Sequence, residues 1–307
     1  FNMNFFYDNN EFKIFEREFV KDKLITLLKK NFDEFLDHKK ISQNNEKIFF
    51  PIKDNCDLNK LSNQAILAKK EIRKFFYDNN YITEKVKKNF SNFLNVDNDI
   101  VKLSDYVSIS PRINVPGLDR ILNWHQDTGT WYDIDINYPE KQVNKDSWKK
   151  IIYIVWISLC DCNEKNGLEI IPESYKYGLQ NAKHFTDKFF GKPLQFSESV
   201  ITKKINNLNH LFITPKAGYG HFFNSLTFHR SMKNESDEIR LSIDFRFEVE
   251  NTKLIDDFGI SKKIIIKRFF YKNFPFFTRF WSLPKQIPGL PKKIYLKLFK
   301  FLKLLVR

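Results

Sequence analysis

A series of short strand-like segments limits the folds open to this chain more than any other feature. Between Leu103 and Glu250 the sequence breaks into runs rich in β-branched and aromatic residues, separated by Pro, Gly, Asn and Asp. The runs are 106–109, 151–159, 168–171, 211–214, 220–227 and 239–249. Several short strands at this spacing are typical of a β-sandwich or barrel. We therefore expect a mainly β core over about residues 104–250, with the stretch 174–209, which lacks a clear period, forming a lid or loop.

The last of these runs shows the clearest two-residue period. Ile239, Leu241, Ile243, Phe245 and Phe247 fall on one face of a strand, and Arg240, Ser242, Asp244 and Arg246 fall on the other. Successive side chains of a strand point to opposite faces of its sheet. The pattern predicts a strand with an apolar face in the core and a charged face opposite.

The first hundred residues have a helical pattern instead. Apolar residues recur at helical spacing over residues 12–28 and 66–76, and again after Thr83, which we expect to be an N-cap. The 33 Phe and 5 Trp of the chain exclude a disordered protein. We expect these helices to pack on the outside of the β core as a brace over residues 1–100.

The basic charge of the chain is concentrated at its C-terminal end. The formal net charge is +14, and residues 261–307 hold 13 Lys or Arg and no Asp or Glu, which leaves 38 basic and 37 acidic residues elsewhere. A nearly neutral main part argues against a nucleic-acid-binding face. The sequence therefore predicts one domain over 1–260, a basic aromatic-rich tail over 261–307, and no nucleic-acid partner.

The end of the tail is predicted to be an amphipathic helix. After Pro291, lysines at 293, 297, 300 and 303 alternate with Leu, Ile and Phe at helical spacing. Such a helix can lie on an anionic membrane, and the alternative is that its apolar side packs on the protein itself. Three Cys argue against a disulfide framework. We expect a cytoplasmic protein, with residues 291–307 as a candidate peripheral contact at the inner membrane face.

Two histidines and one aspartate are the candidates for chemistry. On a strand, His125 and Asp127 would project to one face, and His229 ends a strand-like run 104 residues later. Two His and one carboxylate form a facial triad that suits Fe(II) and leaves three coordination positions open. Arg240 follows His229 by eleven residues, and a guanidinium grips a carboxylate with two parallel bonds.

Over about residues 104–250 the sequence resembles the phytanoyl-CoA dioxygenase-like branch of the Fe(II)/2-oxoglutarate oxygenases. The matching segments are Arg112–Pro116, Trp124–Asp127, Val155–Leu159, Asn166–Ser174, Phe223–Ser231 with Asn234, and Arg240–Ser242. The chain departs from the family pattern at Gly220-His221, where Gly-Asp is common, and at Pro172-Glu-Ser-Tyr175, where Pro-Gly-Ser-His is common. We interpret His221 as an outward-facing strand residue, and the alternative is an extra polar group beside the site.

The resemblance implies a double-stranded β-helix, or jelly roll, with flanking helices. It also implies that His125, Asp127 and His229 bind Fe(II). The co-substrate 2-oxoglutarate would meet Arg240, assisted by Ser242. We expect Arg112 to be a further contact with the co-substrate, and Arg246, on the same strand face as Arg240, is the alternative to Arg240.

The implied activity is O2-dependent hydroxylation of an unactivated C–H bond, with release of succinate and CO2. The substrate would be a small-molecule, acyl, glycan-type or lipid-linked compound. The alternative is a catalytically silent jelly roll that binds a ligand and attaches peripherally to a membrane. The oligomeric state is left open.

Overall fold

The computed structural model describes residues 12–14, 18–43, 50–104, 108–117, 122–128, 152–180, 182–184, 194–196 and 198–250. The tail, with its predicted terminal helix and membrane contact, lies outside these residues and stays a prediction. Within the described ranges, none of the helices combines the length and the apolar character that crossing a membrane requires.

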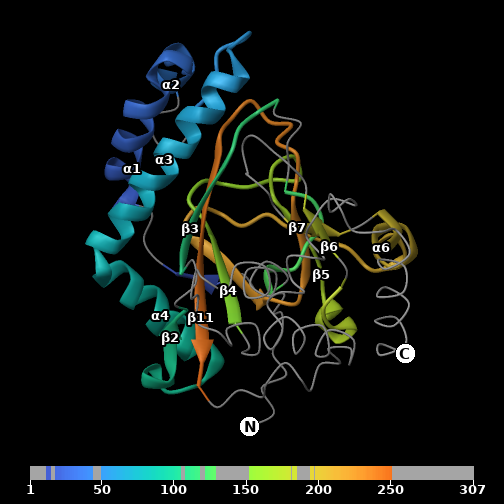
Figure 1. The fold of residues 1–307 in the computed structure, drawn as a ribbon. Helices are drawn as coiled ribbons and strands as arrows, with labels where there is room; N and C mark the ends of the chain where they lie inside the picture. Colours follow the sequence, from blue (N-terminus) through green and yellow to red (C-terminus); the bar gives the residue numbers. More distant parts are fainter. Residues whose placement is uncertain are drawn as a thin grey trace, which may run out of the picture.

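Helices form a layer along one side of the molecule, as predicted for the brace (Figure 1). They are α1 (Glu18–Phe32), α2 (His38–Gln43), α3 (Leu58–Asp78) and α4 (Asn80–Leu94), with the short 3-10 turns η1 (Asp33–Phe35) and η2 (Asn98–Ile100). The start of α3 is capped by Asp57, whose carboxylate accepts bonds from the N–H groups of Asn59 and Lys60.

Two details of the helical prediction are wrong. Thr83 is no N-cap, because α4 begins three residues earlier, after Asn79, and Thr83 is buried within the helix. A single non-helical residue, Asn79, separates α3 from α4, so position 83 lies inside the second helix and not at its start. Phe12 belongs to a two-residue strand, β1 (Phe12–Lys13), whose backbone pairs with the strand that contains Gly220.

Two antiparallel sheets form the β core of the described chain. The larger has the strand order β1-β9-β4-β11-β2, with β3 also paired to β11, and a smaller sheet has the order β10-β5-β8. The strands are β2 (Val101–Leu103), β3 (Ile109–Asn114), β4 (Ile152–Ser158), β5 (Leu168–Ile171), β8 (Leu211–Ile213), β9 (Tyr219–Asn224), β10 (Phe228–Ser231) and β11 (Arg240–Val249). This arrangement confirms the predicted jelly roll with flanking helices.

Strand β11 confirms the alternation read from the sequence. Its apolar side chains pack under the helices, where the ring of Phe245 lies 5.7 Å from that of Phe76 and the ring of Phe247 stacks 5.4 Å from Phe90. The polar side chains of the opposite face are buried too. Buried polar groups need partners, so the inner face of β11 is where a site is expected.

The stretch 174–209 contains several short elements rather than one loop. They are η5 (Ser174–Tyr177), β6 (Ala182–His184), β7 (Leu194–Phe196), α6 (Glu198–Lys203) and η6 (Ile205–Asn207). The backbone N–H of Phe196 donates to the carbonyl of Trp124 at 2.8 Å. At this point the insertion supports the segment that carries His125.

Candidate metal centre

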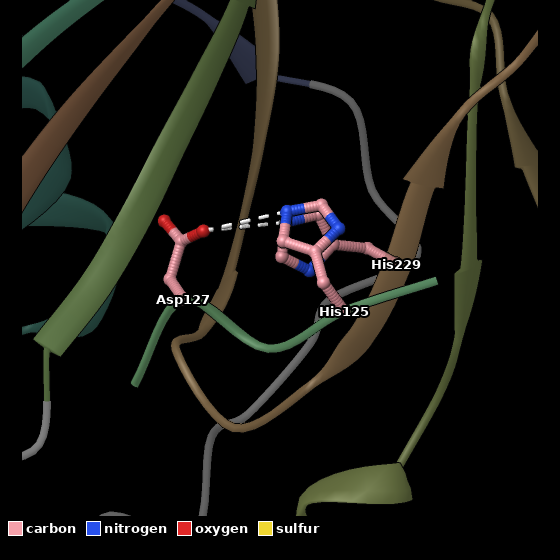
Figure 2. A group of neighbouring side chains, drawn as sticks. All are labelled: His125, Asp127 and His229. Carbon is pink, nitrogen blue, oxygen red and sulfur yellow. Dashed lines mark ion pairs between the residues drawn. The ribbon is translucent and has the colours of Figure 1, made fainter. Parts of the chain in front are cut away.

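The structure brings the three predicted metal ligands together. One possible ligand atom from each of His125, Asp127 and His229 lies within 4.8 Å of the others, and all three residues are buried. Oδ1 of Asp127 is 3.6 Å from Nε2 of His125 and 3.7 Å from Nε2 of His229. Figure 2 shows the two imidazoles side by side, facing one carboxylate oxygen.

Backbone pairing sets the positions of the two histidines. His125 and His229 form an isolated antiparallel bridge, with N–H to carbonyl distances of 3.1 and 3.2 Å in the two directions. The segment does not continue as the strand that the sequence analysis assumed, because a helical turn starts at Asp127. Thr128 anchors this turn, since its hydroxyl bonds that of Ser225 at 2.7 Å. The carboxylate thus reaches the histidines by a turn of the chain.

Hydrogen bonds fix the same tautomer in both rings. Nδ1 of His125 lies 2.8 Å from the carbonyl oxygen of Asn123, and Nδ1 of His229 lies 2.9 Å from that of Thr227. A carbonyl only accepts, so each Nδ1 carries the proton and each neutral ring presents an Nε2 lone pair. Burial, followed by the nearby His125, lowers the pKa of His229 to about 3. Neutral imidazoles are the form that binds a metal ion.

These lone pairs make the donor set a good fit to a divalent cation. Among the described residues, the buried Nε2 of His125 has no hydrogen-bond partner. It and Nε2 of His229 both face Oδ1 of Asp127, and three electron-pair donors directed at one point repel each other unless a cation lies between them. Nitrogen and carboxylate donors in this number match the facial triad of Fe(II) sites.

Arg246 binds the carboxylate of the triad. Its Nε and Nη2 donate to Oδ2 of Asp127 at 2.9 and 2.7 Å. Burial raises the pKa of Asp127, but the positive charge of Arg246 outweighs it and holds this pKa well below its ordinary value. Arg246 was the sequence-based alternative for the co-substrate contact, and in the structure its guanidinium is engaged by Asp127.

The other predicted contacts lie on the same inner face. Arg240 is 1% exposed, donates from Nη1 to the hydroxyl of Ser242 at 2.6 Å, and lies 5.6 Å from the ring centroid of Trp156. Its buried Nε has no partner among the described residues. Arg112 donates from Nε to Oδ2 of Asp244 at 2.8 Å. Of these two arginines and Arg246, only Arg240 has no carboxylate partner in the described part of the chain.

A cavity lies beside the triad. The residues that line it are Arg112, Leu122, His125, Ile154, Trp156, Leu168, Phe223, His229, Ser231 and Asp244. The two candidate metal-binding imidazoles therefore border a cavity whose lining also contains charged and apolar side chains.

The interpretation of His221 as an outward-facing residue is wrong. His221 is 6% exposed, and it lies two residues before Phe223, which lines the cavity. Alternation along β9 puts both on the inner face, and His221 is paired with Trp156 of β4. The sequence pattern gave no means of choosing the face, because Phe222 and Phe223 are apolar residues on opposite faces of β9, and both are buried.

A second buried carboxylate was missed by the sequence analysis. Glu169 accepts a bond from Nδ1 of His210 at 2.5 Å at one oxygen and from Nε of Arg230 at 2.5 Å at the other. The guanidinium of Arg230 lies 4.9 Å from the ring centroid of Trp124, and the ring of His210 lies 5.2 Å from that ring. This cluster braces the residues that adjoin both histidines of the triad. Predicting this contact would have required the register of β10 and β5, in which Arg230 lies opposite Glu169. The pattern of apolar and polar residues does not contain that register.

Comparison with known proteins agrees with the resemblance. The sequence matches the family model described as "Phytanoyl-CoA dioxygenase (PhyH)" over residues 14–242. The search of curated proteins found no match. Among solved structures, EvdO2 from Micromonospora carbonacea var. aurantiaca is 14% identical, with a TM-score of 0.42, over 60% of this chain and 65% of that chain.

Two further structures are similar at the same level. EctD from S. alaskensis, solved with 2-oxoglutarate and 5-hydroxyectoine, is 16% identical, with a TM-score of 0.35, over 50% of this chain and 46% of that chain. SnoK, described as a non-heme alpha ketoglutarate dependent carbocyclase, is 16% identical, with a TM-score of 0.33, over 46% of this chain and 49% of that chain. The match spans less than two thirds of each of these three chains. Because the family model covers well over half of the sequence, this protein belongs to the phytanoyl-CoA dioxygenase family.

Proposed function

We propose that this protein is an Fe(II)- and 2-oxoglutarate-dependent dioxygenase in which His125, Asp127 and His229 hold the iron. The observation that carries the proposal is the convergence of two Nε2 lone pairs and one carboxylate oxygen at a buried point. When bound, Fe(II) with 2-oxoglutarate and O2 would supply the oxidising chemistry, in which one oxygen atom of O2 enters an unactivated C–H bond and the other enters the succinate formed from 2-oxoglutarate as CO2 is released. Family membership supports the same assignment.

The far carboxylate of 2-oxoglutarate is assigned to Arg240. A buried guanidinium without a countercharge is costly, and Arg240 is the inner-face arginine without a carboxylate among the described residues. Ser242 accepts a bond from Arg240, which leaves its own O–H free to donate to the ligand. Trp156 holds the plane of the guanidinium from one side. Arg112 is retained as a further contact, because it borders the cavity.

The primary substrate is proposed to be a small-molecule, acyl, glycan-type or lipid-linked compound that places a C–H bond in the cavity. Apolar walls from Ile154, Trp156 and Phe223 support this, because they exclude water from the place of reaction.

Anaerobic titration with Fe(II) and 2-oxoglutarate tests the proposal. The expected result is a visible charge-transfer band that requires both additions, followed by succinate release when O2 is admitted. The matched control is His125→Ala, which should fold normally and give neither signal. A wild-type protein that forms no band would contradict the proposal.

A cytoplasmic location, with the tail on the inner membrane face, is a separate proposal that rests on the sequence of residues 291–307. Flotation with anionic vesicles tests it by comparing the full chain with a chain cut after Leu283. Equal binding of the two would remove the membrane contact.

A further inference from the structure

We propose that Arg246 is a positioning residue that restricts Asp127 to binding the metal through one oxygen, and so keeps one more coordination position open. The inference rests on the proposed function. Both donors of Arg246 bind the same atom, Oδ2, at 2.9 and 2.7 Å. The other oxygen, Oδ1, is the one that faces the two imidazoles. The carboxylate is thus divided into one oxygen for the arginine and one for the ion.

The guanidinium is itself held in place. The side chain of Arg246 is 5% exposed, and its Nη2 also lies 3.6 Å from Oδ2 of Asp244. Asp244 in turn accepts a bond from Arg112 at 2.8 Å. These four residues form a row of alternating charge, from Asp127 through Arg246 and Asp244 to Arg112. Rotating the Asp127 carboxylate would break two charge-assisted bonds at once.

The backbone of Arg246 is fixed on both sides as well. Its N–H donates to the carbonyl of Ser108 at 2.8 Å, and its carbonyl accepts from Ser104 at 2.8 Å. On the other side of β11 it is paired with Ile154 of β4. The strand therefore fixes the backbone of Arg246 where its guanidinium reaches Asp127.

The way Asp127 binds the ion determines how many coordination positions of the ion stay open. A facial triad with a one-oxygen carboxylate uses three positions of an octahedral ion and leaves three open. A carboxylate that bound through both oxygens would use a fourth. Two open positions accommodate a chelating co-substrate and nothing more. Holding Oδ2 away from the ion therefore preserves the position that a third reactant needs.

If the Arg246–Asp127 ion pair had only a structural role, its loss would not change the number of open coordination positions. The ion pair between Arg230 and Glu169 provides a matched comparison. Arg230 likewise binds a buried carboxylate through Nε, that of Glu169, but both oxygens of Glu169 are engaged, one by Arg230 and the other by His210. Removing either arginine breaks an ion pair with a buried carboxylate, but only Arg246 contacts a triad residue. Arg230→Gln is thus the control for loss of such a pair.

The test measures how many water molecules reach a bound Mn(II) ion, from solvent proton relaxation of the saturated, anaerobic full-length protein. Arg246→Gln should lower the relaxation enhancement per bound ion by about one third, from three open positions to two. Asp127→Ala should raise it by about one third, and adding Arg246→Gln to Asp127→Ala should change nothing further. Arg230→Gln should give the wild-type value.

A second variant covers the case in which Arg246→Gln does not fold. Arg246→Lys keeps the buried positive charge but loses the two-bond grip, and its enhancement should lie between the wild-type and Gln values. Wild-type enhancement in both Arg246 variants would overturn the inference, as would an equal drop in Arg230→Gln or a further change in the Asp127→Ala background. A wild-type protein that binds no Mn(II) would overturn the proposed function as well, so the two failures are distinguishable.

Discussion

Two buried carboxylates, Asp127 and Glu169, each have arginine and histidine side chains as neighbours. They differ in how many of their oxygens accept hydrogen bonds from these neighbours. Glu169 has one oxygen bound by His210 and the other by Arg230. Asp127 has one oxygen bound twice by Arg246, and its other oxygen faces two Nε2 atoms that carry no proton. A saturated carboxylate stabilises a fold, whereas one that faces other electron-pair donors requires a cation. On this basis Glu169 has a structural role, and Asp127 belongs to the proposed binding site.

The largest expected effect comes from removing the unsatisfied carboxylate. Asp127→Ala should abolish 2-oxoglutarate turnover, because two imidazoles alone do not complete the triad. Succinate release measures the loss. Circular dichroism should show an unchanged fold, and turnover that survives in this variant would mean that the metal lies elsewhere.

Breaking the saturated carboxylate should act on stability instead. Glu169→Gln should lower the free energy of unfolding by about 2–4 kcal/mol, because it removes the charge of a buried pair whose partners are partly exposed. Urea unfolding measures this effect. Binding of Fe(II) by the folded fraction should persist, and its complete loss would show that the two carboxylates are not separate in role.

Arg240 extends the comparison to a buried cation, because it has no carboxylate partner among the described residues. Arg240→Leu should raise the apparent KM for 2-oxoglutarate about 10- to 100-fold, which corresponds to about 1.5–3 kcal/mol for charge-assisted bonds. Steady-state kinetics with varied 2-oxoglutarate measures it. Fe(II) affinity should stay at the wild-type value, and an unchanged KM would remove Arg240 from the co-substrate site.

The metal-free protein should show a pH dependence that originates in the triad. The pKa of His229 is lowered to about 3 in the fold, so its contribution is fully present above the unfolded pKa of about 6.5 and is lost as the pH falls toward 3. From pH 7 to pH 5 the loss should be about 2 kcal/mol.

Urea unfolding of wild type and His229→Gln at these two pH values isolates this contribution, since Asp127 titrates below this range. The loss of stability should be smaller in His229→Gln. Equal losses in the two proteins would assign the pH dependence to other groups.

Local patterns in the sequence predicted what depends on local geometry. The alternation of β11 placed Phe245 and Asp244 on opposite faces, and the spacing of His125 and Asp127 marked the triad, even though a turn replaces the expected strand there. The family resemblance added the jelly roll.

Features that depend on strand register could not be predicted. Arg246 meets Asp127 across 119 residues of chain, and Glu169 meets Arg230 across 61. Periodicity says which face a side chain occupies but not which residue lies opposite. The same limit applies to His221, whose face was decided by the pairing of β9 with β4.

The central claim is that one ion is bound by two Nε2 atoms and one carboxylate oxygen. Anomalous diffraction at the iron edge, from crystals grown anaerobically with Fe(II), tests it most directly. The account predicts a single strong peak bonded by Nε2 of His125, Nε2 of His229 and Oδ1 of Asp127, with Oδ2 still bound by Arg246. A peak at Glu169, or no peak at the triad, would contradict it.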